Sequence, residues 1–264
     1  MTTTATLAPV SLELRTGPRH WWAGFRSMIT WHLVSLRLWL VLLAVVQVLS
    51  GVGFVLGFGL FFEQIPLSVA LFVSTGVPVV NLVMTGMVLG PQLVADQKAS
   101  HSFDFIHSLP VPHTASAAAW YVVCLIGGLP AVAVSLAVAV WRYDGLPLAV
   151  TPDVAPALLL TAFTGTMVGL AVAHAITSPM VTRLVTQVLV FAMFAFTPIL
   201  FPVEQMPAWL GAVNSALPLR HMADMVRASL TDLPFENLAT SYAVVGAWGL
   251  VCAVLAVRAL GRRR

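Results

Sequence analysis

Residues 67–94 read LSVALFVSTGVPVVNLVMTGMVLGPQLV and contain no charged side chain. The hydrocarbon core of a bilayer is ~30 Å thick and an α-helix rises ~1.5 Å per residue, so about 20 apolar residues suffice to cross it. This run is therefore long enough to span a membrane as one helix.

The same length criterion selects five further apolar runs, which we place at 38–62, 115–140, 154–176, 184–201 and 242–260. The composition agrees, because 59% of the residues are hydrophobic, only 9% are charged and the mean hydropathy is +0.94. Soluble domains carry about 25% charged residues. We predict an all-α, polytopic membrane protein in which residues 1–264 form a single transmembrane domain with six spanning helices.

The basic residues predict the orientation of the spans, because Lys and Arg are retained on the cytoplasmic side during insertion. With the N-terminus inside, most of the basic residues fall on the cytoplasmic side: Arg15, Arg19, Arg26, Arg37, Lys98, Arg183, Arg258, Arg262, Arg263 and Arg264. We expect a multi-pass protein of the cell membrane with both termini cytoplasmic and a disordered tail at 1–17.

Residues 18–37 have the pattern of an amphipathic helix that lies in the headgroup plane. At helical spacing, one side carries aromatic and aliphatic residues, and most of the cations lie on the other. The candidate interfacial residues are Trp21, Trp22, Phe25, Arg26 and Ile29. A plain anchor that only orients the first span remains an alternative to a mechanical role.

The predicted cytoplasmic connection at 95–114 mixes charged and aromatic residues before Pro110 and Pro112 interrupt it. It either presents a small helix to a soluble partner or forms a solvated loop whose aromatic rings rest on the membrane. Its candidate residues are Asp96, Lys98, Phe103, Asp104, Phe105, Ile106 and Leu109. The connection also holds three histidines spaced six apart, which puts them on different helix faces and argues against a metal site.

Prolines divide the outer segment at 202–240 into short pieces, since proline breaks a continuing helix. Broken helices need protein, water or headgroups around their unpaired backbone, so we expect two short re-entrant helices. Their polar residues either line an exit vestibule or pair with one another in an outer cap. The candidates are Pro202, Glu204, Pro207, Arg220, Asp224 and Arg227.

Polar residues inside the predicted spans are candidates for a transport pathway or for helix packing, namely Asn81, Gln92, Thr186 and Gln187.

The chain has no phosphate-binding loop, since its one lysine, Lys98, follows Gln97. It has no zinc-protease or nucleophile-elbow motif and no acidic residue deep in a span. We therefore expect no catalysis, cofactor or metal in this chain, and any energy for transport must come from another one.

Two stretches resemble the membrane subunits of type-2 ABC transporters, the permeases of drug, antibiotic or polysaccharide exporters. These are LGPQLVADQKASHSFDFIHSLPVPHTASAAAW and FTPILFPVEQMPAWLGAVNSALPLRHMADMVRASL. The first is similar to the family's charged segment and Leu-Pro-Val turn, although the family commonly has a Glu-Arg pair and a glycine where this chain has Asp96, Lys98 and Ser100 or His101. The second is similar to the family's Phe-Pro-hydrophobic-Glu-x-hydrophobic-Pro pattern, followed by a later Pro and Arg.

The resemblance implies an export permease whose coupling helix lies within 96–110 and sits in a groove of a separate ABC ATPase. It also implies two permeases, identical or homologous, two ATPase copies that bind ATP and Mg, and a pathway near spans two and five. Two other classes remain open. One is a membrane enzyme or assembly factor that acts on lipid-linked material, and the other is a secondary carrier.

Overall fold

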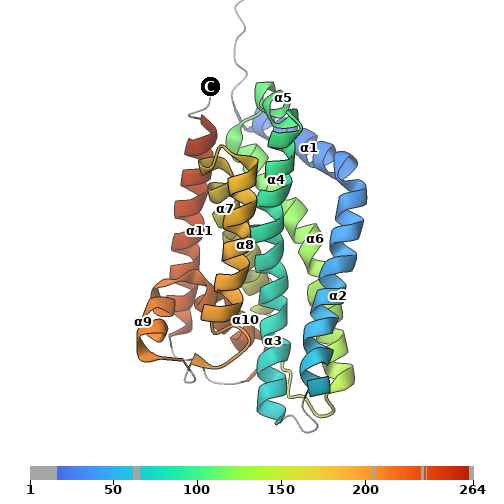
Figure 1. Cartoon of the computed structure of the whole chain (residues 1–264), viewed down its shortest axis with the longest axis vertical. Coiled ribbons are helices and arrows are strands. Elements are labelled where there is room, and N and C mark those ends of the chain that lie inside the picture. The colour runs from blue at the N-terminus through green and yellow to red at the C-terminus, as the bar shows by residue number, and fades with distance from the viewer. Residues whose placement is uncertain (1–16, 62–65, 204–205, 233–234, 236, 262–264) are drawn as a thin grey trace, which may run out of the picture.

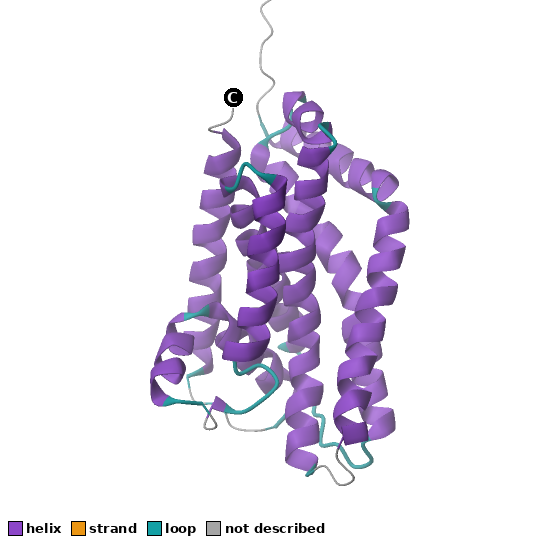
Figure 2. Ribbon diagram, viewed as in Figure 1, coloured by secondary structure: helices purple, strands orange, loops and turns teal. Residues whose placement is uncertain are grey.

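The computed structural model describes residues 17–61, 66–203, 206–232, 235 and 237–261. Within these residues every regular element is a helix (Figure 2). Six helical runs are long and apolar enough to cross a membrane: α2 (Arg37–Phe61), the continuous run of α3 (Leu67–Val83), η1 (Met84–Leu89) and α4 (Gly90–Ala99), then α6 (His113–Arg142), α7 (Val154–Ala175), α8 (Pro179–Phe196) and α11 (Leu238–Gly261). The predicted all-α class with six spanning helices is confirmed.

Four further helices lie at the two ends of the bundle (Figure 1). At one end are α1 (Pro18–Ser35) and α5 (Ser102–Ser108), and at the other are α9 (Ala208–Ala216) and α10 (Pro218–Leu230). They correspond to the predicted interfacial helix, connecting segment and broken outer helices. Their depth in a bilayer stays a prediction.

The second span forms the centre of the bundle, because α3 packs against both α6 and α7 while η1 packs along α7. Lipid tails are as apolar as leucine, so helices in a bilayer associate where small residues allow close approach. A Cβ added at Gly169 of α7 would lie 2.1 Å from the carbonyl oxygen of Gly86 in η1. The two backbones are thus in direct contact.

A π-helical segment, η1, lies within the second span. There the N–H of Gly90 donates to the carbonyl of Thr85, five residues back, and the following Pro91 has no N–H to donate. Such segments are rare and occur frequently at functional sites.

The fifth span differs in position from its prediction, since α8 runs from Pro179 to Phe196 and not over 184–201. The helix begins early because Ser178 caps it and Pro179 occupies its first turn, where a missing N–H is harmless. It ends before Pro198, a residue type that disfavours helix in the residue preceding it. The charged Arg183 therefore lies inside the helix.

The predicted connection at 95–114 also differs from what is found, because the second span continues as helix to Ala99. A turn at Ser100 and His101 follows, then α5, and α6 begins at His113. Similarly, α11 begins at Leu238, inside the predicted outer segment. The predicted tail at 1–17 lies outside the described residues except for Gly17.

Candidate functional site

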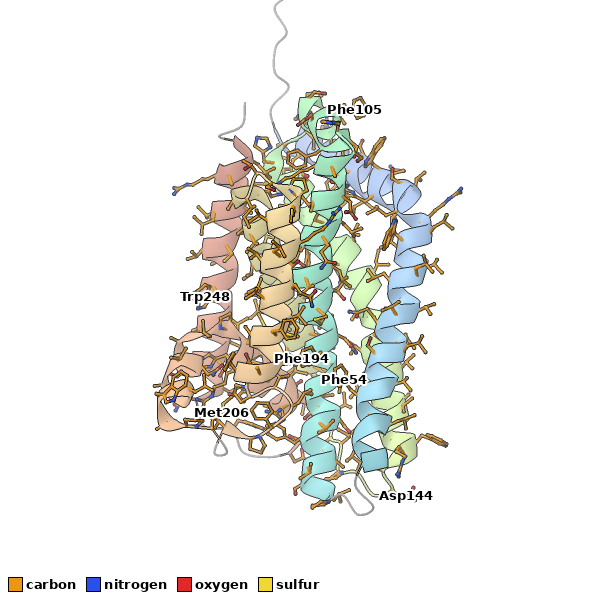
Figure 3. The ribbon with its side chains drawn as sticks, viewed as in Figure 1. Phe54, Phe105, Asp144, Phe194, Met206 and Trp248 are labelled. Carbon is orange, nitrogen blue, oxygen red and sulfur yellow. The ribbon has the colours of Figure 1, made fainter. Side chains whose placement is uncertain are left out.

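The predicted coupling residues lie at the end of the bundle where α4, α5 and α1 meet the start of α6 and the end of α7 (Figures 1 and 3). The chain reverses between α4 and α5 through His101, whose φ of 58° is left-handed. This conformation suits glycine far better than histidine. It sets α5 directly beyond the end of the second span.

The side chain of Lys98 forms hydrogen bonds within this chain. Its Nζ donates to the carbonyl oxygens of Ala173 and, at 2.7 Å, of Ile176, which lie at the C-terminal end of α7. A cation there satisfies carbonyls that have no helical partner and complements the helix dipole. Lys98 therefore ties the second span to the fourth.

Asp96 and Phe103 also face other parts of this chain. Asp96 accepts a hydrogen bond from Arg183, which links α4 to α8. Phe103 is buried in a cluster with Trp120 and Leu170, and its ring centroid lies 5.8 Å from that of His174. Both side chains thus connect helices at this end of the bundle, and their role in docking stays a prediction.

The exposed part of the site is a single face of α5. Phe105 is 55% exposed and the adjacent Asp104 is exposed as well, whereas Ile106 and Leu109 are partly buried. Phe103 and Phe105, which the sequence grouped together, thus lie on opposite sides of one short helix. We call Asp104 and Phe105 the exposed α5 face.

α1 lies across the connection between α5 and α6 and braces it. The ring of Trp31 packs 6.0 Å from that of Phe105, and Trp21 Nε1 donates to Thr114 Oγ1 at 2.9 Å. A Cβ added at Gly24 would lie 3.1 Å from Pro112 Cδ, so the helix backbone rests directly on this connection. α1 therefore packs against α6 and the connection before it, and it contacts α5 through Trp31.

The faces of α1 differ in part from the predicted ones. The buried stripe consists of Gly24, Met28 and His32, and it faces the protein. Trp22 is 61% exposed and Arg26 is exposed, while the predicted partners Trp21, Phe25 and Ile29 are partly buried. Trp21, Trp22 and Phe25 form an aromatic cluster at the start of the helix.

At the opposite end, the charged residues of α10 pair with one another and with the bundle. Arg227 is 3% exposed, and its guanidinium donates to Thr75 Oγ1 at 3.2 Å and to the Ile199 carbonyl at 3.0 Å. Asp224 lies 3.6 Å from both Arg227 and Arg220. The geometry is that of a self-paired cap rather than of a charged vestibule.

Burial raises the pKa of the Asp224 carboxyl above its ordinary value, although Arg227, Arg220 and His221 act in the opposite direction.

Two of the predicted outer residues are prolines next to α9. Pro207 precedes the helix and its carbonyl accepts from the N–H of Leu210, and Pro202 lies in the connection before it. Glu204 lies outside the described residues.

The four predicted pathway residues do not form one group. Asn81 is fully buried, Gln92 Nε2 donates to Thr186 Oγ1 at 3.3 Å between α4 and α8, and Gln187 is exposed on α8. The sequence analysis missed Gln47, whose Nε2 donates to the Asn81 carbonyl at 2.9 Å and to Thr85 Oγ1 at 2.7 Å. A glutamine in the middle of the first apolar run was the signal that could have identified it.

The arrangement of six spans, with short helices packed at both ends, can be compared with known families. A family model described as ABC-2 family transporter protein matches residues 76–258, which is more than half of the chain. The chain belongs to this family. As an ABC-2 transporter protein it is a multi-pass membrane component of a transporter, in a family that works with an ABC ATPase. No curated protein matches the sequence.

The matched region begins within α3 and ends in α11, so it includes the exposed α5 face, η1 and the charged cluster of Arg220, Asp224 and Arg227 on α10. α1 and α2 precede it. The resemblance to type-2 ABC permeases noted from the sequence is therefore confirmed over the part of this ABC-2 protein that contains the predicted coupling and outer segments.

Proposed function

We propose that this chain is the permease subunit of an ABC exporter in the cell membrane, with both termini cytoplasmic. It forms the translocation pathway with a second permease, identical or homologous, and two copies of a separate ATPase drive it. ATP and Mg bind to the ATPase. The observation that carries the proposal is the exposed α5 face, which projects from the end of the second span and is braced by α1.

The contacts of α5 supply a route from an ATPase to the spans. One turn joins α5 to α4, and α4 continues through η1 into α3 without a break in the helix. Lys98 connects α4 to the end of α7, and the pair of Asp96 with Arg183 connects it to α8. A displacement of α5 is thereby transmitted to three spans.

The exposed surface of α8 supports the proposal that a second permease packs against this chain. Among the spanning windows, those of α2 and α8 are the least buried. One side of α8 exposes Leu184, Val188 and Phe191 together with the polar Gln187. An amide among apolar side chains is costly to leave facing lipid, and a partner helix would satisfy it.

Substitutions of the two phenylalanines test the coupling role. Phe105→Asp is expected to lower permease-stimulated ATP hydrolysis at least about tenfold, a loss of about 1.4 kcal/mol of docking free energy. Phe105→Leu, which keeps an apolar group, should retain stimulation. Phe103→Asp puts a carboxylate into the apolar cluster around Trp120 and Leu170, so it should lower the yield of folded protein instead.

Stimulated hydrolysis is measured in proteoliposomes that contain the permease and its ATPase, and folding is checked by the elution profile of the purified permease. Normal stimulation by well-folded Phe105→Asp protein would contradict the coupling role. Transport that continues after ATP depletion but stops with an uncoupler would instead indicate a secondary carrier, and activity on lipid-linked material without the ATPase would indicate a membrane enzyme.

A further inference from the structure

Gln47 forms a buried polar contact in the middle of the first span, α2. The residue is 3% exposed and is the only amide side chain of this helix. Its Nε2 donates to the Asn81 carbonyl at 2.9 Å and to Thr85 Oγ1 at 2.7 Å, so both amide protons are used. Thr85 Oγ1 in turn donates to the same carbonyl at 2.8 Å. The three residues form a closed hydrogen-bonded triangle between α2 and the second span.

The triangle lies at the start of η1. Asn81 belongs to the last turn of α3, and Thr85 is the second residue of η1. The Thr85 carbonyl also accepts the N–H of Gly90, the hydrogen bond over five residues that marks the π-helical conformation. Gln47 therefore holds the last α-helical turn and the first π-helical turn of the second span together.

The backbone of α2 lies close to the second span at the same level. A Cβ added at Gly51, one turn from Gln47, would lie 2.9 Å from Asn81 Nδ2. In a bilayer no water replaces a lost partner, so a buried amide keeps its hydrogen bonds within the protein. One polar contact and one close packing contact thus fix α2 to the start of η1, although α2 is among the least buried spans.

η1 and the two residues after it combine three features at which helices bend, namely a π-helical turn, glycine and proline. Gly86 lies within η1, and Gly90 and Pro91 follow it directly. Pro91 has no N–H, so it gives no backbone hydrogen bond to the preceding turn. A Cβ added at Gly86 would lie 2.6 Å from the Thr166 nitrogen of α7. This bendable segment is therefore held between α7 and the Gln47 contact of α2.

α2 is also the direct continuation of α1, as Figure 1 shows. The N–H of Leu36, the residue between the two helices, donates to the His32 carbonyl. α1 in turn contacts the exposed α5 face through the rings of Trp31 and Phe105. A displacement of α1 at this face is therefore carried along α2 to Gln47.

We propose that Gln47 is a positioning residue of the transport cycle, which couples movement of α1 and α2 to bending of the second span at η1. This route enters η1 from the first span, whereas the route through Lys98 and Asp96 enters from α4. The inference rests on the proposed permease function, because the ATPase supplies the movement. Gln47 acts only through Asn81 and Thr85 and is not required for docking of the ATPase.

The experiment measures backbone amide exchange of residues 84–90 by mass spectrometry, in the complete complex of permease and ATPase in nanodiscs. Exchange is compared between the nucleotide-free complex and the complex trapped with ADP and vanadate. In the wild type, trapping is expected to change exchange in this segment several-fold. In Gln47→Met, which keeps an unbranched side chain of similar volume but removes both donors, complex formation should persist and the trapping-dependent difference should be lost.

Ser50→Ala is the matched control, because Ser50 is the other hydroxyl or amide residue of the stretch 38–57 and lies one turn from Gln47. It should respond to trapping as the wild type does. Thr85→Val, which keeps the β-branched shape but removes the hydroxyl, is a second variant that breaks the same triangle and should show a partial loss. It keeps the test decisive if Gln47→Met does not fold.

A residue that only stabilised the fold would give a different result. Exchange would then rise in Gln47→Met in both states, and a trapping-dependent difference as large as in the wild type would overturn the inference. A wild-type complex that hydrolyses ATP but shows no change at residues 84–90 would also overturn it, while the proposed function would stand. A wild-type chain that forms no complex with the ATPase would overturn the proposed function itself.

Discussion

Buried charged and polar side chains are the residues on which this structure depends most. In a bilayer, water does not satisfy such groups, so each needs a partner within the protein. Arg227 has Thr75, Ile199 and Asp224, and its guanidinium also stacks 3.5 Å above the ring of Phe72. It thereby fastens α10 to α3 and to the connection after α8.

Arg227→Met is expected to destabilise the protein by about 3 kcal/mol, because it leaves the buried Thr75 hydroxyl and Ile199 carbonyl without their donor and Asp224 with Arg220 alone. Arg220→Met should cost about 1 kcal/mol or less, since Arg220 is a partly exposed member of the same cluster. The thermal unfolding temperatures of both variants in detergent provide the measurement. Equal losses in the two variants would show that burial of Arg227 is not what matters.

His32 is buried between α1 and α6, with its ring 4.4 Å from that of Trp120. Burial lowers the pKa of this imidazole from 6.5 to about 4. Because the folded value lies below the unfolded one, the stability associated with His32 is fully present above the unfolded pKa and is lost as the pH falls from 6.5 towards 4.

We predict that acidification from about pH 7 to about pH 5 lowers the unfolding temperature of the wild type, with a free-energy slope of at most ~1.4 kcal/mol per pH unit from this group. His32→Phe should reduce that dependence because it removes the proton-binding site. His20→Phe, on the less buried start of α1, is the control and should keep it. An unchanged pH dependence in His32→Phe would refute the assignment.

At the scale of the helices, close backbone approach decides which spans pack together. η1 and α7 meet through Gly86 and Gly169, where an added Cβ would lie 2.6 Å and 2.1 Å from backbone atoms of the facing helix. In contrast, a Cβ at Gly246 of α11 would meet nothing within 4 Å. Glycines in similar apolar sequence therefore differ in whether a side chain would fit at their positions.

Gly169→Ala is expected to separate α7 from η1 and to cost about 3 kcal/mol or more, since its Cβ would collide with backbone that cannot rotate away. Gly246→Ala should be neutral or stabilising by up to ~1 kcal/mol, because alanine favours helix over glycine. Unfolding temperatures of the two purified variants compare them directly. A stable Gly169→Ala protein would be inconsistent with the packing described.

The two phenylalanines of α5, Phe103 and Phe105, show at the same scale which features of this helix the sequence could predict. The alternation of aromatic and polar residues left a small helix and a solvated loop open, and residues 102–108 form the helix α5. The sequence could not predict that Phe103 is buried and Phe105 exposed. Their burial depends on where Trp120, Leu170 and Trp31 lie in three other helices.

At the scale of the whole molecule, the exposed α5 face and the loop at Asp144 lie at opposite ends of the bundle (Figure 3). The proposed topology places the first inside the cell and the second outside. Both native cysteines, Cys124 and Cys252, are buried, so single introduced cysteines can be probed without removing them.

We predict that Asp144→Cys reacts with a membrane-impermeant maleimide in intact cells, whereas Ser108→Cys reacts only after permeabilisation. Both positions are exposed in the structure. Labelling is read from the mass shift of the purified protein, and the unmodified chain provides the background. The reverse pattern would mean that the termini are outside and that the exposed α5 face cannot meet a cytoplasmic ATPase.

The sequence by itself determined the class of protein, the number of spanning helices and the positions of the short segments between them. These follow from run length, charge and proline, which are local properties of the chain. Even there, Arg183 was taken as a boundary although it lies inside α8, because its partner Asp96 is 87 residues away.

Tertiary structure alone decided which of the candidate residues are buried within the bundle and which are exposed. Lys98, Phe103 and Arg227 are occupied within the bundle, whereas Phe105 is exposed. The physical reason is that satisfaction of a buried group depends on atoms brought from distant helices, and no local pattern in the chain specifies them.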